Sequence, residues 1–142
     1  MKKSQQIFAG FVVLMFVLPT IGQIVQPSKG GGSEVVEWSS AFSVSVCGSD
    51  VSLPDIVAYP LLIGNGSIIV RGNINVNNPP ILKDVFSLLN LTFNRNQLGS
   101  YKNGNSCSAS SGSVKLYING QLSSDFENHK LADGEYIDVV FQ

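Results

Sequence analysis

Most of the chemistry that this chain could perform depends on one histidine. Because His129 is the only histidine, a Cys–His pair would have to join it to Cys47 or Cys107, and a Ser-His-Asp triad would need it as well. His129 lies between Asn128 and Lys130 in a polar stretch, where a solvated imidazole with no ligand role is the ordinary case. We therefore predict that the protein is not an enzyme.

Acidic residues near the C-terminus offer a second possible chemistry, because paired carboxylates can hydrolyse glycosides. Their density is better explained by solvated turns and strand ends. Two cysteines far apart in sequence and one histidine match no familiar metal-binding spacing. We expect no catalytic, metal or cofactor site. The acidic residues are Asp125, Glu127, Asp133, Glu135 and Asp138.

Composition favours one domain with a neutral polar surface. The chain has 142 residues, the size of a single domain, and 44% of them are hydrophobic, which is enough for a core. Only 13% are charged, and the net charge is −1. With no basic stripe, nucleic acid is not an expected partner.

The N-terminal stretch predicts export. After Lys2 and Lys3, residues 7–25 carry no charge. Residues 1–25 are either a signal peptide, with Pro19 ending its apolar helix, or a membrane anchor just long enough to span a bilayer. We favour a retained anchor or a slowly processed signal. In both cases the remainder is extracytoplasmic, membrane-anchored or secreted.

Residues 26–33 read as a flexible Gly-rich tether, and residues 34–142 as the folded β-rich domain. The two cysteines of an exported domain, Cys47 and Cys107, are most simply a disulfide. Buried free thiols and an intermolecular bridge remain as alternatives. Asn65 and Asn90 lie in glycosylation sequons, which matter only where the chain meets that machinery.

Period-two patterning predicts most of the elements. Residues 42–53 read as a hairpin with one buried face, Asn65-Gly66 marks a second turn, and residues 67–76 read as one strand or as two interrupted at Gly72. Residues 114–122 form a third hairpin candidate around Asn119-Gly120. The first and third hairpins could be a weak internal repeat, although hairpins commonly share this pattern.

One helix is expected after residues 77–80, whose two asparagines and two prolines suit a cap and first turn. Apolar residues at helical spacing follow from Ile81 to Leu89, and Leu91 and Phe93 suggest that the chain then re-enters a strand. Residues 95–112 read as a long polar loop. Such loops are either functional or mobile, and this composition favours mobility.

The C-terminal residues 114–142 resemble the last third of a β-grasp domain, as in ubiquitin-like and sulfur-carrier proteins. A strand ends in Asn119-Gly120, a loop follows, and Asp133-Gly134 turns into a strand in which Ile137 alternates with Val139 and Phe141. Those families use a free Gly-Gly carboxylate, whereas the residues here are Phe141-Gln142. Their carrier chemistry therefore does not transfer. The fold class predicted is α+β, mainly β, with a β-grasp-like or small sandwich-like sheet and one helix, preceded by an N-terminal hydrophobic helix.

A broader resemblance, over residues 39–141, is to small exported archaeal proteins of unknown function. In these proteins His-x-His pairs precede two strands and would suit a metal. The corresponding residues here are Ser39 and Ala41, and Leu61 and Ile63, which bind no transition metal. The resemblance implies the fold and export, and its departures imply that any metal role is lost.

Three functions remain. The first is a non-enzymatic accessory domain, tethered to the membrane, that contacts another envelope or membrane-complex protein. The second is a surface filament or coat subunit that assembles by strand addition, with residues 26–38 supplying the strand. The third is a small redox or metal-linked partner protein. Val35, Val36 and Trp38 are candidate contact residues, although Trp38 is expected to be at least partly buried.

Overall fold

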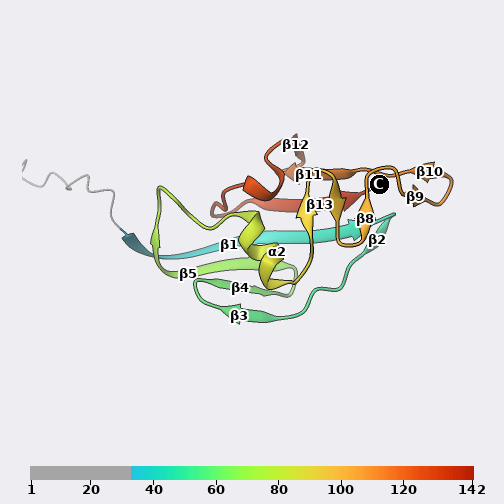
Figure 1. Cartoon of the computed structure of the whole chain (residues 1–142). Helices are drawn as coiled ribbons and strands as arrows, with labels where there is room; N and C mark the ends of the chain where they lie inside the picture. Colours follow the sequence, from blue (N-terminus) through green and yellow to red (C-terminus); the bar gives the residue numbers. More distant parts are fainter. Residues whose placement is uncertain (1–32) are drawn as a thin grey trace, which may run out of the picture. The chain divides into compact units, whose positions relative to one another are not determined.

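The computed structural model describes residues 33–142, and their main element is a mixed sheet of eight strands (Figure 1). The strand order is β12-β11-β13-β1-β5-β4-β3, and β2 pairs with β1. The strands are β1 (Ser33–Val46), β2 (Ser49–Asp50), β3 (Ile56–Ala58), β4 (Leu61–Gly64), β5 (Ser67–Asn75), β11 (Val114–Ile118), β12 (Gln121–Ser123) and β13 (Tyr136–Phe141).

Two strands from opposite ends of this region form the centre of the sheet. β1 runs parallel to β13, from Ala41 opposite Tyr136 to Val46 opposite Phe141. On its other side β1 is antiparallel to β5, and β13 is antiparallel to β11. Both central strands are rich in β-branched and aromatic residues, which suit a sheet packed on one face.

The three predicted hairpin turns are confirmed. Cys47-Gly48 joins β1 to β2, Asn65-Gly66 joins β4 to β5, and Asn119-Gly120 joins β11 to β12. All six turn residues have positive φ, the backbone that a tight two-residue hairpin needs. Gly72, with a φ of 123°, does not interrupt β5, which is one continuous strand.

The predicted helix is α2 (Leu82–Leu88), and it lies across one face of the sheet (Figure 1). Its N-cap is Ile81 rather than one of the asparagines, because Asp84 accepts a hydrogen bond from the Ile81 backbone N–H at 2.9 Å. Leu82, Val85 and Phe86 face the sheet and are buried. The prediction of a mainly β, α+β domain is confirmed.

Residues 95–112 differ from the predicted irregular loop. They contain most of a three-stranded sheet, β6 (Phe93–Asn94), β7 (Gln97–Leu98) and β8 (Tyr101–Lys102), and a two-stranded one, β9 (Ser106–Cys107) and β10 (Ser110–Ser111). Asparagine side chains complete the turns: Asn94 accepts from the Asn96 N–H, and Asn105 from the Lys102 N–H. The polar composition of residues 95–112, which is typical of mobile loops, therefore belongs here to tight turns between short strands.

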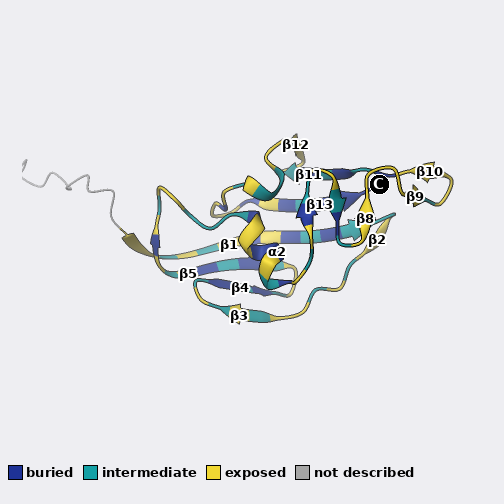
Figure 2. Ribbon diagram, viewed as in Figure 1, coloured by how far each residue is buried: buried dark blue, intermediate teal, exposed yellow. Residues whose placement is uncertain are grey.

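The sheet has one covered and one uncovered face. Along β1 the even-numbered Phe42 and Val44 are buried beneath α2, whereas odd-numbered residues such as Val35 are exposed. The same alternation appears as coloured bands in Figure 2 along β5 and along β13 as far as Val139, after which Val140 is buried as well. Ile137, Val139 and Phe141 of β13 are fully buried, as the C-terminal pattern predicts. No other helix or strand of residues 33–142 packs on the opposite face.

The predicted signal peptide or anchor and nearly all of the predicted tether lie outside the described residues. Ser33, placed in the tether by sequence, is the first residue of β1. Within residues 33–142 no helix is long and apolar enough to span a bilayer.

Candidate interaction surface

The uncovered face of the main sheet carries a row of apolar side chains at one edge. Val57 of β3 lies opposite Leu62 of β4, and Leu62 lies opposite Ile69 of β5. Ile69 lies opposite Ser39 of β1, an odd-numbered residue of the uncovered face. Directly opposed residues share a face, so these side chains form one stripe.

A second row crosses the other half of the same face. Leu122 of β12 lies opposite Tyr117 of β11, Tyr117 opposite Asp138 of β13, and Asp138 opposite Ser43 of β1. The Ser43 hydroxyl donates to Asp138 Oδ1 at 2.8 Å, which leaves its oxygen free to accept from the Tyr136 hydroxyl at 3.1 Å. These bonds fix the Tyr136 ring across β1.

Large hydrophobic side chains on this face remain open to solvent. Val57 is 69% exposed, Leu122 68% and Tyr136 44%, and Val35 of β1 reaches 85%. The nearby charges are few, and Arg71 pairs with Glu37 across the strands at 3.0 Å. Exposed apolar groups on a sheet face with few charges make this face a candidate protein-binding surface. We call Val57, Leu62, Ile69, Tyr117, Leu122 and Tyr136 the open-face patch.

The three contact residues predicted from sequence divide between the two faces. Val36 and Trp38 are even-numbered, so they share the face of Phe42 and pack against the core, each half-buried. The sequence does not display this division, because Val35 interrupts the alternation of apolar and polar residues. Val35 alone points to the uncovered side. Trp38 is partly buried, as predicted.

His129 is not the solvated imidazole that its polar neighbours suggest. Its side chain is 12% exposed, and Nε2 lies 3.0 Å from both carboxylate oxygens of Glu135. Hydrogen bonding to Glu135 raises the pKa of His129 against the opposing effect of burial, and Asp125, 3.8 Å from Nδ1, adds to the rise. Glu135 itself is 7% exposed, so the expectation of a solvated strand end is wrong for this carboxylate.

This ion pair closes the segment between η2 (Phe126–Asn128) and β13. The Ala132 N–H also donates to Glu135 at 3.0 Å. On the helix side, the Leu82 N–H donates to the His129 carbonyl, and the Leu131 N–H donates to the Pro80 carbonyl. The only histidine of the chain is therefore used to dock this segment onto the start of α2.

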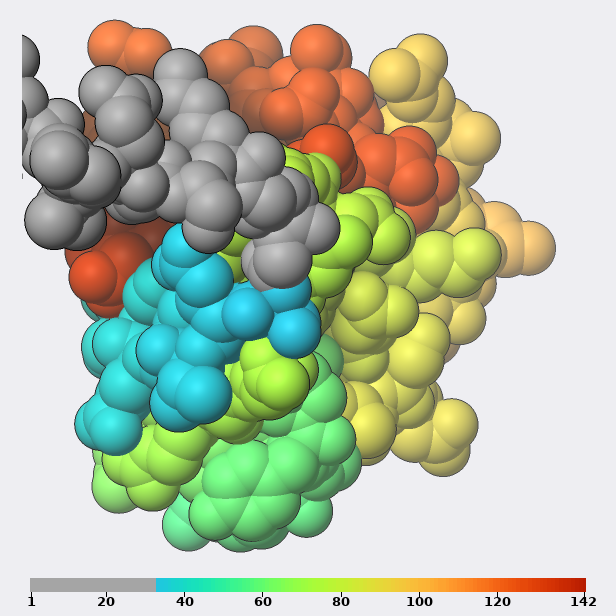
Figure 3. All heavy atoms as spheres, turned by 90° about the vertical axis from the view of Figure 1, so that its left-hand side faces the viewer, coloured from blue at the N-terminus to red at the C-terminus, as the bar shows by residue number. Residues whose placement is uncertain are grey.

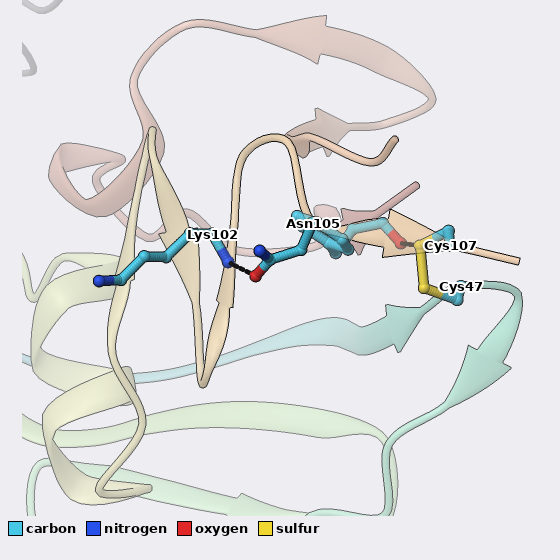
Figure 4. Close-up of a disulfide and its surroundings, with 5 residues drawn as sticks. Cys47, Lys102, Asn105 and Cys107 are labelled. Carbon is cyan, nitrogen blue, oxygen red and sulfur yellow. Dashed lines mark hydrogen bonds between the residues drawn. A yellow bond between two sulfur atoms is a disulfide. The ribbon is translucent and has the colours of Figure 1, made fainter. Parts of the chain in front are cut away.

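Cys47 and Cys107 form the predicted disulfide, across a sequence separation of 60 (Figure 4). It links the turn after β1 to β9, and the Cys47 N–H donates to the carbonyl of Phe141 in β13. The Lys102 N–H donates to Asn105 Oδ1 at 2.8 Å just before β9. The disulfide thus fastens the short strands to the centre of the sheet.

The two sequon asparagines are both exposed. Asn65 lies in the β4–β5 turn with a φ of 50°, and Asn90 follows α2 with a φ of 56°. Neither packs in the core. Both positions are accessible to modification.

The four residues that correspond to the His-x-His pairs of the archaeal proteins in the resemblance do not converge. Ser39 and Ala41 lie on the uncovered face of β1, whereas Leu61 and Ile63 are buried on the other face of β4. Among residues 33–142, no three histidine, cysteine or acidic side chains gather as a metal site would need.

A cavity of about 400 Å³ opens where β1 leaves β5, past the pair Ala41–Ser67. It has an apolar floor that includes Val44 and Ile63, and the carboxylates of Asp50 and Asp55 are the charged groups in its lining. Its lining also contains serines, but no histidine, cysteine or lysine.

Sequence reasoning did not identify the open-face patch. Leu122 and Val57 lie in short edge strands, where one or two apolar residues give no readable alternation. Tyr136 stands next to the acidic turn and reads as a strand end.

No family model, curated protein or solved structure gives a significant match to the chain.

Proposed function

We propose that this protein is a non-enzymatic, extracytoplasmic accessory domain that binds another envelope or membrane-complex protein through the open-face patch. The observation that carries the proposal is the exposure of Val57, Leu122 and Tyr136 on one sheet face, which extends from the β3 edge to the β12 edge and which no helix or strand of residues 33–142 covers. Covering such a patch removes apolar surface from water, which is the main favourable term in protein association.

Two observations support a location outside the cytoplasm. The Cys47–Cys107 disulfide is stable in an oxidising compartment and rare where thiols are kept reduced. Residues 7–25 are uncharged and follow two lysines, as in a signal peptide or an anchor. We place the domain outside the membrane and tethered to it through this segment, with Asn65 and Asn90 as glycosylation sites where the machinery exists.

The proposed fold type is a β-grasp-like sheet rather than a sandwich. Its support is the order β5-β1-β13-β11, with a parallel central pair formed by the first and last long strands and α2 in the connection between the two halves. In this arrangement the helix covers one sheet face only. The second face is therefore left open, and we assign the binding role to it.

We propose a non-enzymatic role because the side chains most often used in catalysis already have structural partners. His129 is held by Glu135, and both cysteines are in the disulfide. The positions that would suit a metal in the resembling proteins carry Ser39, Ala41, Leu61 and Ile63, which supports the same view.

Co-purification from native membranes tests the proposal. The full chain is expressed as wild type, as Leu122→Arg, as Val57→Arg and as Ser87→Arg, a control that places the same charge on the exposed side of α2. We expect one discrete partner to remain with wild type and with Ser87→Arg, and to be lost from both open-face variants. Equal retention by all four folded proteins would refute binding through this face.

A second candidate function, assembly by strand addition, is supported by the edge of β1 before Ser39, with which no strand of residues 33–142 pairs. However, Ser33 to Trp38 already pair with β5 of their own domain. These residues can receive a strand at their other edge, but they cannot leave to complete a neighbour's sheet without breaking that pairing.

A further inference from the structure

The first residues of β1 have a partner on one side only. Ser33 to Trp38 pair with β5, while β13 begins opposite Ala41. The edge closes at Ser39, whose N–H donates to Asp133 Oδ1 at 3.0 Å and whose carbonyl accepts from the Gly134 N–H at 2.9 Å. Within residues 33–142, nothing pairs with this edge before Ser39. Figure 3 faces this end of the molecule, where β1 (cyan) lies beside β5 (green).

Along β1, the backbone N–H and C=O groups of successive residues point alternately to the two sides of the strand, and this identifies the groups on the edge. Ser39 and Ala41 direct their N–H groups towards β13 and the turn before it, whereas the Phe42 N–H bonds Gly66 on the opposite side. The β1–β5 register runs without a bulge from Ser33 to Ala41. Val35 and Glu37 therefore direct their N–H and C=O groups outward, where they can pair with an added strand.

We propose that this edge pairs antiparallel with the same edge of a second copy of the chain, around a two-fold axis at Val35. In a continuous sheet, opposed residues must share a face, so only registers centred on a single residue are allowed. Centring on Glu34 or Glu37 opposes two carboxylates, which is unfavourable. Centring on Trp38 opposes Glu37 to Ser39, whose backbone groups are already bonded, and centring on Ser33 would pair β1 with residues outside 33–142. The remaining centres are Val35 and Val36.

The outward backbone groups favour Val35. A Val35 centre makes Val35 and its symmetry mate a hydrogen-bonded pair and sets Glu37 opposite Ser33 on both sides, for about six hydrogen bonds. A register centred on Val36 makes about four hydrogen bonds before the pairing reaches Ser39, whose backbone groups are already bonded. It would also oppose Val35 to a carboxylate. At the Val35 centre, the most exposed large hydrophobic side chain of the described residues, 85% exposed, packs against its own copy.

This dimer is closed rather than filamentous, because an isologous two-fold interface uses up the edge on both copies. It uses the edge of β1 and leaves the open-face patch free. The inference therefore goes beyond the proposed function, and either can fail without the other.

Cysteine cross-linking of the purified full chain tests the register. In the Val35-centred dimer the two Val35 Cα atoms are about 5.5 Å apart, within disulfide reach. Two Glu37 residues are offset by four positions, or about 14 Å. We expect Val35→Cys to give a covalent dimer on mild oxidation, at least about tenfold more than Glu37→Cys.

A mixed experiment gives an independent readout. Ser33→Cys and Glu37→Cys chains should cross-link when mixed but not separately, since only unlike positions are opposed. Adding Val35→Pro to both should abolish that cross-link while leaving the melting temperature within a few degrees, because the Val35 N–H faces away from β5. The proposal is overturned if Val35→Cys forms no dimer or cross-links no better than Glu37→Cys.

Discussion

The imidazole of His129 lies 3.0 Å from both carboxylate oxygens of Glu135, and this pair holds the segment before β13 against the start of α2. The two residues are six positions apart, and both side chains are largely buried. The pair therefore stabilises the segment that leads into β13, and this contribution depends on pH.

The first prediction concerns pH. Because folding raises the pKa of His129 above its ordinary value of 6.5, the charged imidazole stabilises the fold. This contribution is fully present below 6.5 and is lost as pH rises through the raised pKa. Melting curves across this range should show wild type losing stability, while His129→Gln shows little of this slope. A slope of equal size in His129→Gln would assign it to other groups.

The second prediction concerns the partner of His129. Glu135→Ala leaves a buried imidazole and the Ala132 N–H without their acceptor, so unfolding free energy should fall by about 2–4 kcal/mol. Denaturant unfolding measures the loss. Glu127→Ala in η2 is the matched control and should change little, because the carboxylate of this half-buried residue makes no ion pair among the described residues. Equal losses from both variants would contradict a special role for the pair.

The third prediction concerns the disulfide. Its loop of 60 residues predicts a loss of about 4 kcal/mol on replacing Cys47 and Cys107 together by serine. The wild type should lose similar stability in reductant, and the double variant should not respond to reductant at all. Titration of two free thiols in the unreduced native protein would exclude the bond.

The fourth prediction concerns Trp38. This side chain packs against the core from the covered face, so Trp38→Ala should lower the melting temperature clearly. Val57→Ala, on the uncovered face and 69% exposed, is the control and should change stability by less than about 0.5 kcal/mol. If Trp38→Ala melts like wild type but no longer binds the partner, Trp38 is a contact residue instead.

The hairpins could be predicted from sequence because each combines a two-residue turn with alternating apolar residues. Asn65-Gly66 and Asn119-Gly120 supply positive φ, and Phe42 and Val44 mark the buried face. The disulfide followed from the cysteine count and from export. Local pattern and tertiary structure agree at these positions.

Other features depend on contacts between distant residues, which a single sequence does not display. The pairing of β1 with β13 joins residues more than ninety positions apart, such as Ser43 and Asp138. The burial of His129 requires Glu135 and the start of α2, so its polar neighbours gave the wrong environment. In residues 95–112, turn-forming asparagines resemble a mobile loop until their backbone partners are known.

Site-specific photo-crosslinking in native membranes tests most directly whether the open-face patch binds a partner. A photoreactive side chain is placed at Leu122, at Val57 and, as the control on α2, at Ser87. We predict that Leu122 and Val57 cross-link to the same discrete envelope or membrane protein and that Ser87 does not. Cross-links from Ser87 alone, or none from Leu122 and Val57 in the folded, membrane-located protein, would show that this face is not the binding surface.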